Sequence, residues 1–172
     1  SQEDLEKAMA FYDYVEIQPL ECYRPLIEQH SVATMDRLKE ILRNIIETGK
    51  SLGKIVVATG DVHYLTTEQK IYRDIYIQAQ GIGGVRNPLY VYNAERRRKT
   101  KSPNQRFLTT DEMLDAFAWL GKELAYEMVV TNTNKITDMT EVIIPVHDRL
   151  YPPSIEGANE KLEEICYKTA HE

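Results

Sequence analysis

The sequence has few of the residues that define several large classes of protein. Only two of its 172 residues are cysteine, Cys22 and Cys166, and they lie far apart in the chain. Two distant cysteines do not make a disulfide-based scaffold, so a reducing, cytoplasmic location is expected. No apolar run approaches the roughly 20 residues that a membrane-spanning helix needs. The opening residues Ser1 to Asp4 are too polar and acidic for a signal peptide, and the absence of a first Met suggests a piece of a longer chain.

Positive charge is also scarce, which argues against nucleic-acid binding by the chain as a whole. The 21 Lys and Arg residues are outnumbered by 27 Asp and Glu residues, giving a formal net charge of −6. A local basic patch is still compatible with this balance. One run of charge could contact DNA phosphates, although most such runs are simply solvated surface. It consists of Arg96, Arg97, Arg98, Lys99 and Lys101.

What the chain does contain is typical of a globular α/β protein. Its length suits one core, and 42% of its residues are hydrophobic. Residues 12–18 read as a strand that ends at Pro19, and residues 34–52 repeat apolar side chains with the period of a helix. The run Ile55-Val56-Val57-Ala58 reads as a strand buried on both faces. Together these segments predict a β-α-β unit with parallel strands.

The rest of the chain divides at its glycines and its polar stretches. A helix over 66–80 is expected to use Ile71, Ile75 and Ile77 as its apolar side chains. Thr109 and Glu112 form a capping box that opens a run of helices, and a short helix closes the chain. We therefore predict a β/α domain over 1–80, a loop excursion over 81–108 and a helical connector over 109–172.

Asp61 and His63 are the strongest candidates for a functional site. They follow directly on the strand at 55–59, and the ends of parallel strands are where α/β proteins place their chemistry. In an extended chain, residues two apart point the same way, so this carboxylate and imidazole could bind one metal ion. The alternative is that Asp61 caps the next helix while His63 packs or faces solvent.

Two ligands are fewer than a metal site requires. Glu16 and Gln18 lie near the end of the neighbouring strand and could reach the same face, but a polar rim is the simpler explanation for both. No serine, cysteine or lysine lies in a setting typical of a nucleophile. The sequence also has no strand bearing the acidic cluster with which a polymerase holds two magnesium ions.

Four segments, in the same order along nearly the whole chain, resemble one family of proteins. They are residues 12–19 (YDYVEIQP), 57–65 (VATGDVHYL), 109–114 (TTDEML) and 130–136 (VTNTNKI). All four are similar to the PolC-type alpha subunits of DNA polymerase III, the replicative polymerases of low-GC Gram-positive bacteria. The basic run over 95–101 differs from the family pattern, so the resemblance gives it no role.

The resemblance implies that this chain is a fragment of such a polymerase. In the family, a polymerase-and-histidinol-phosphatase (PHP) domain is split by an inserted 3′–5′ exonuclease, and this piece resembles the half after the insertion plus the connector towards the palm. The implied fold is part of a seven-stranded (β/α)7 barrel with metals at its C-terminal rim. Asp61 and His63 then match the last metal motif, which would bind zinc, manganese or magnesium in the complete domain and weakly or not at all here.

Two alternatives to an inactive polymerase fragment remain open from the sequence. A free-standing metal-dependent phosphoesterase of the PHP superfamily would need a complete ligand set, and only Asp61 and His63 qualify. A structural or interaction module without chemistry would need none. Because half a barrel leaves strand edges unpaired, the fragment is expected to self-associate, unless the helices over 34–52 and 110–133 cover the short sheet.

Overall fold

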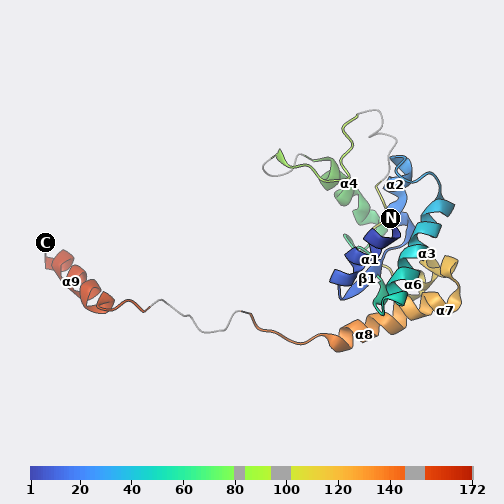
Figure 1. Ribbon diagram of the computed structural model, residues 1–172. Helices are drawn as coiled ribbons and strands as arrows, with labels where there is room; N and C mark the ends of the chain where they lie inside the picture. The colour runs from blue at the N-terminus through green and yellow to red at the C-terminus, as the bar shows by residue number, and fades with distance from the viewer. Residues whose placement is uncertain (80–83, 94–101, 146–153, 172) are drawn as a thin grey trace. The chain divides into compact units, whose positions relative to one another are not determined.

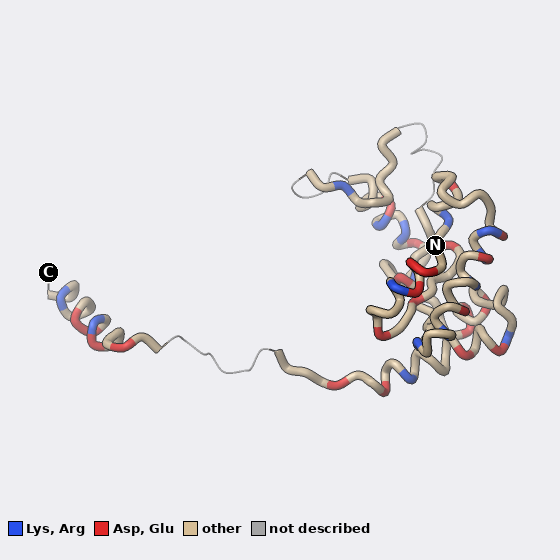
Figure 2. The backbone as a smooth tube through the Cα atoms, in the orientation of Figure 1, with Lys and Arg blue, Asp and Glu red and all other residues tan. Residues whose placement is uncertain are grey.

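A computed structural model describes residues 1–79, 84–93, 102–145 and 154–171, and it divides into two compact units. The first unit, Ser1–Met139, contains a two-stranded sheet with helices around it (Figure 1). In the second unit, Thr140–Glu172, α9 (Ala158–His171) carries charges of both signs along its length (Figure 2). None of the described helices combines the length and the apolar character that crossing a bilayer requires.

The predicted β-α-β unit is present. It consists of β1 (Tyr14–Ile17), α3 (Met35–Ser51) and β2 (Ile55–Ala58), and the two strands pair in parallel with Tyr14 opposite Ile55 and Ile17 opposite Ala58. The mixed α/β class is therefore confirmed. Among the described residues the sheet has two strands and does not close into a barrel. The seven-stranded barrel accordingly stays a prediction.

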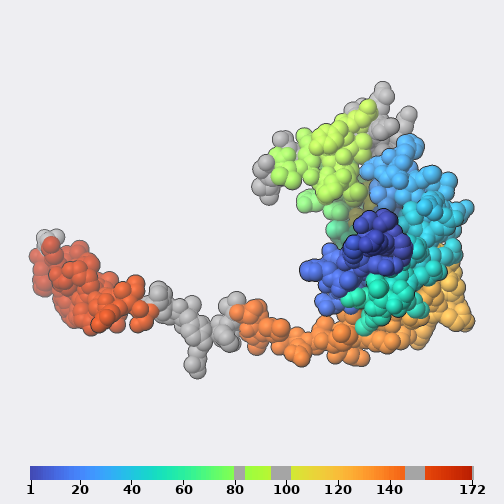
Figure 3. Space-filling view, viewed as in Figure 1, coloured from blue at the N-terminus to red at the C-terminus, as the bar shows by residue number. Residues whose placement is uncertain are grey.

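Helix α3 covers one face of this sheet, as its apolar period predicts. Leu38, Leu42 and Ile46 are each at most 3% exposed. Near its end the helix comes so close to the strands that a Cβ on Gly49 would lie 3.0 Å from Val56 Cγ2, so only glycine fits there without a shift. Helix α1 (Gln2–Phe11) lies against α3, dark blue beside teal in Figure 3, and the Gln2 side chain donates a hydrogen bond to the Thr48 hydroxyl.

A second group of helices packs against β2. It comprises α6 (Thr110–Ala116), η4 (Ala118–Leu120), α7 (Lys122–Tyr126), the π-helical turn η5 (Glu127–Thr131) and α8 (Asn132–Met139). Phe117 and Met128 have no exposed surface and share one core with Ala58 of β2. The Asn132 side-chain amide donates to the Val56 carbonyl at 2.8 Å. These helices therefore cover β2 along the edge that faces away from β1.

Short helical segments complete the first unit, and one of them differs from expectation. They are η1 (Leu20–Tyr23), α2 (Arg24–Glu28), η2 (Thr67–Gln69) and α4 (Lys70–Gln78). On α4, Ile77 is 1% exposed, but Ile71 and Ile75 are 59% and 62% exposed. The expected apolar face is wrong, because successive helical residues turn by about 100° and place Ile75 and Ile77 roughly 200° apart. The basic run Arg96 to Lys101 lies outside the described residues.

The capping box at the start of α6 is confirmed, and it extends to an ion pair. The Glu112 side chain accepts from the Thr109 N–H at 2.9 Å, and the Thr109 hydroxyl accepts from the Glu112 N–H. The Arg106 guanidinium donates to both Glu112 carboxylate oxygens, at 2.5 and 3.2 Å. These hydrogen bonds lower the pKa of the Glu112 carboxyl to about 2, and the bond from Arg106 makes the largest contribution.

This pKa makes the fold sensitive to acid. A carboxyl whose pKa is lower in the folded than in the unfolded chain stabilises the fold above the unfolded value, about 4.3. That contribution is lost as the pH falls through about 2. We expect unfolding by urea to become easier between about pH 4.5 and 2, and Glu112→Gln to flatten this part of the profile. The exposed residue Glu123 on α7 gives the control, Glu123→Gln. Identical profiles for wild type and Glu112→Gln would contradict the prediction.

Candidate functional site

The candidate site begins where the two strands end. The Thr59 N–H donates to the Ile17 carbonyl at 3.0 Å, which carries the parallel pairing one residue past β2. The Thr59 hydroxyl donates to the Glu16 carboxylate at 3.2 Å. The chain then leaves the extended conformation, because Asp61 has a φ of +46°. This left-handed backbone is uncommon outside glycine, although aspartate tolerates it better than most residues.

The turn at Asp61 brings Asp61 and His63 side by side. Asp61 Oδ1 lies 3.3 Å from His63 Nε2, and the two side chains are 34% and 37% exposed. The sequence argument predicted the proximity for a reason that is wrong. The side chains do not meet through the alternation of an extended strand, since the backbone turns between β2 and His63. A carboxylate oxygen and an imidazole nitrogen, both of them potential metal ligands, are nevertheless adjacent and reachable from solvent.

Gln105, which lies 44 positions beyond Asp61 in the chain, holds this pair in place. Its side-chain Nε2 donates to Asp61 Oδ2 at 2.6 Å, while its main-chain carbonyl accepts from the His63 N–H at 2.8 Å. Gln105 is only 3% exposed. Its side-chain Oε1 accepts from Arg73 Nε at 3.3 Å, so both ends of this buried amide are engaged, and leaving either end unpaired would cost free energy. Gln105 thus fixes both the backbone and the carboxylate of the candidate motif.

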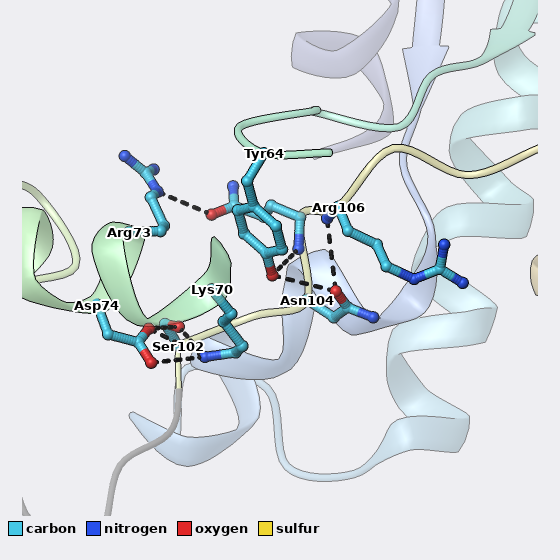
Figure 4. Close-up of polar contacts among 8 residues, drawn as sticks. Tyr64, Lys70, Arg73, Asp74, Ser102, Asn104 and Arg106 are labelled. Carbon is cyan, nitrogen blue, oxygen red and sulfur yellow. Dashed lines mark hydrogen bonds and ion pairs between the residues drawn. The ribbon is translucent and has the colours of Figure 1, made fainter. Parts of the chain in front are cut away.

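The segment around Gln105 is itself anchored by Tyr64, as Figure 4 shows. The Tyr64 hydroxyl donates to Asn104 Oδ1 at 3.1 Å and accepts from the Gln105 N–H at 3.0 Å. The Phe107 N–H donates to the Tyr64 carbonyl at 2.8 Å. Sequence analysis missed the roles of these residues, placing Asn104, Gln105 and Phe107 in the loop excursion and Tyr64 in the preceding domain. They lie about 40 positions apart, and no local pattern in either segment indicates the pairing.

The start of α4 is attached to the same segment through three polar side chains. Lys70 Nζ lies 2.9 Å from Asp74 Oδ1 and 2.5 Å from Ser102 Oγ, and the Ser102 hydroxyl also donates to Asp74 (Figure 4). The cluster therefore connects α4 to the segment that begins at Ser102.

The other two candidates from the sequence, Glu16 and Gln18, are held by residues other than Asp61 and His63. Glu16 is held by Thr59, and the Gln18 N–H donates to the Tyr23 hydroxyl at 3.1 Å. Burial, with a further contribution from the Asp61 charge, raises the pKa of the Cys22 thiol to about 12, so it stays protonated at neutral pH. Within the described part of the chain, no three His, Cys, Asp or Glu side chains are grouped so that they could hold a metal ion.

Known proteins similar to this chain cover nearly all of it. One, from Bacillus subtilis (strain 168), is 48% identical over 170 residues, which is 99% of this chain and 11% of the relative. Another, from Halalkalibacterium halodurans, is 48% identical over 168 residues, or 98% of this chain and 11% of the relative. Both are named DNA polymerase III PolC-type. This chain is similar to one segment of PolC-type DNA polymerase III.

The resemblance expected from the four sequence segments is thus confirmed. A third PolC-type relative, from Latilactobacillus sakei subsp. sakei, is 44% identical over 170 residues. The chain spans only about a ninth of the length of these PolC-type relatives, 11% in each case. No family model matches the chain. The name PolC-type DNA polymerase III therefore applies to much longer proteins, and this chain corresponds to one part of them.

Proposed function

We propose that this chain is a segment of a bacterial replicative DNA polymerase. The observation that carries the proposal is similarity over 97–100% of the chain to bacterial proteins that share the name PolC-type DNA polymerase III. Template-directed DNA synthesis then belongs to the complete polymerase. The segment alone is expected to be inactive, because its sequence has no strand bearing the acidic cluster of a two-metal polymerase site.

Within that polymerase, residues 1–80 form the second half of a PHP-like domain, 81–108 a loop excursion and 109–172 a connector towards the palm. The upstream half of the domain, the exonuclease and the palm are the neighbours that this arrangement requires, and DNA reaches the segment through them. The open outer edge of β1 supports the first assignment. In the described part of the chain, β2 is the only strand that pairs with β1, and an upstream strand could pair with its other edge.

Asp61 and His63 supply two ligands of a divalent-metal site in the complete domain. Two donor atoms bound at about 2.0–2.2 Å to one tetrahedral or octahedral ion lie roughly 3.0–3.5 Å apart. The 3.3 Å between Asp61 Oδ1 and His63 Nε2 fits that spacing. Carboxylate oxygen and imidazole nitrogen together suit zinc or manganese, and the carboxylate alone suits magnesium. When bound, the ion would polarise a phosphoester, and the hydrogen bond from Gln105 would hold the Asp61 carboxylate in place as a ligand.

A structural role for the same pair is the second candidate. In the described part of the chain the pair has no third ligand beside it. Asp61, His63 and Gln105 already hydrogen-bond or pair with one another, and they join β2 to the segment that carries Gln105. A carboxylate and an imidazole used in this way stabilise a turn without any ion.

Metal analysis of the complete polymerase separates these two candidates. Wild-type enzyme, dialysed free of loosely bound ions, should extend a primed template and contain tightly bound zinc or manganese. Asp61→Asn and His63→Gln should each remove about one ion per chain. Gln105→Ala should keep both ligands but lower the affinity for the metal about 10- to 100-fold. Loss of a hydrogen bond that orients a metal ligand has this effect in other metalloproteins.

The control variant is His171→Gln, which removes an exposed imidazole from α9. Its metal content should equal that of wild type. Equal metal content in Asp61→Asn and His63→Gln, with lower resistance to urea, would reject the metal site and leave the structural role. A complete chain that binds primed DNA but cannot extend it under any metal condition would contradict the polymerase assignment itself.

A further inference from the structure

A pocket of about 450 Å³ opens beside His63, against the outer side of α4. Its walls include His63, Tyr72, Arg73 and Tyr76, so it combines aromatic rings with one permanent positive charge. Ile71 and Ile75 are also exposed on α4, but they do not line the pocket. The pocket is therefore chemically distinct from the apolar strip that these two isoleucines form.

Tyr72 and Tyr76 form the aromatic part of the pocket. They are four residues apart on α4, which places them next to each other on one side of the helix. Their side chains are 70% and 66% exposed. Large rings that bury so little surface contribute little to the stability of this chain, and most of their surface is open to a ligand.

Arg73 lies between these rings in sequence and is held from behind. Its Nε donates to Gln105 Oε1 at 3.3 Å, and its guanidinium carbon lies 5.7 Å from the centre of the Tyr76 ring. Figure 4 shows the end of the guanidinium directed away from Tyr64. Nη1 and Nη2 donate to none of the described residues, so four N–H groups remain for an anion. Fork-shaped guanidinium donors match phosphate oxygens.

We propose that this pocket binds one nucleotide of single-stranded DNA, with the base against Tyr72 or Tyr76 and the phosphate on Arg73. This deepens the proposed function and rests on it. A nucleotide carries a flat ring and an anion a few ångströms apart, and the Arg73 guanidinium carbon lies 5.7 Å from the centre of the Tyr76 ring. An acidic peptide would pair with Arg73 but would leave the two rings without a partner.

Gln105 connects this subsite to the candidate metal motif. The same side chain accepts from Arg73 and donates to Asp61. His63 lines the pocket and lies 3.3 Å from Asp61. A phosphate on Arg73 would therefore lie next to the pair proposed as metal ligands. Since one arginine neutralises about one phosphate, binding at this subsite should depend only weakly on salt, with a slope of about −0.7.

Photocrosslinking on the complete polymerase tests the proposal at the level of single residues. A single-stranded oligonucleotide containing 5-iodouracil is irradiated with the enzyme, and the crosslinked peptides are identified by mass spectrometry. Crosslinks should form at Tyr72 or Tyr76. Arg73→Gln leaves both rings in place and should lower their yield about tenfold, the effect of one charge-assisted hydrogen bond. Tyr126→Ala, which removes an exposed tyrosine from α7, should leave the yield unchanged.

Three outcomes would overturn the subsite. Crosslinks elsewhere in an enzyme that still extends primers, with none on α4, would reject it while leaving the polymerase assignment intact. Crosslinks on α4 that persist at full yield in Arg73→Gln would show that the guanidinium does not hold a phosphate. Protection of Tyr72 and Tyr76 from hydroxyl radicals in DNA-free enzyme would show that another part of the polymerase covers these rings.

Discussion

Replacing Phe117 with alanine is expected to lower the free energy of unfolding by about 3–5 kcal/mol, the usual cost of removing a buried aromatic ring. Phe117 follows α6 and has no exposed surface. It belongs to the same core as Met128 and Ala58, so its ring joins the C-terminal helices to the sheet. Small domains are stable by only about 5–15 kcal/mol, so this loss would remove a large part of the total.

Urea unfolding of the 172-residue chain, followed by far-UV circular dichroism, measures this effect. Phe11→Ala is the matched control, because Phe11 is 84% exposed at the end of α1. It should change the free energy of unfolding by less than about 0.5 kcal/mol. A loss below about 1 kcal/mol for Phe117→Ala would mean that α6 to α8 do not share a core with the strands.

Those parts of the fold that depend on local pattern could be predicted from the sequence. The apolar period of α3 and the β-branched run of β2 each depend on residues within about four positions of one another, and both elements form as expected. The capping box of Thr109 and Glu112 is local in the same sense. A short-range pattern is sufficient to predict an element when the residues that stabilise the element lie close to one another in sequence.

The candidate site could be predicted only in part, because its geometry is not local. Asp61 and His63 stand out through their place after a strand, but Gln105 reaches Asp61 from 44 positions away. The pairing of Tyr64 with Asn104 has the same character. On α4, a short helix with few buried contacts, the burial of Ile77 was decided by the surrounding packing. Nothing in the sequence of α4 alone indicates which side faces inward.

Asn132→Leu is expected to lower the free energy of unfolding by about 1–3 kcal/mol, although leucine is the more hydrophobic residue. Asn132 is 5% exposed at the start of α8 and donates to the carbonyl of Val56, itself 1% exposed. This carbonyl points away from β1. Among the described residues, no strand pairs with that edge of β2 and could donate to the carbonyl. Leucine would leave it buried without a donor, which costs the full desolvation of the group.

Asn134→Leu, two residues further along α8, is the matched control, because Asn134 is exposed and the same substitution there unpairs no buried carbonyl. It should change stability by less than about 0.5 kcal/mol. Urea unfolding of both variants decides between two views of residues 109–139. A large loss for Asn132→Leu alone means that α8 completes the edge of β2 and folds together with it. Equal, small effects would instead support the sequence-based division, in which a separate connector begins at residue 109 and the strands are stable without it.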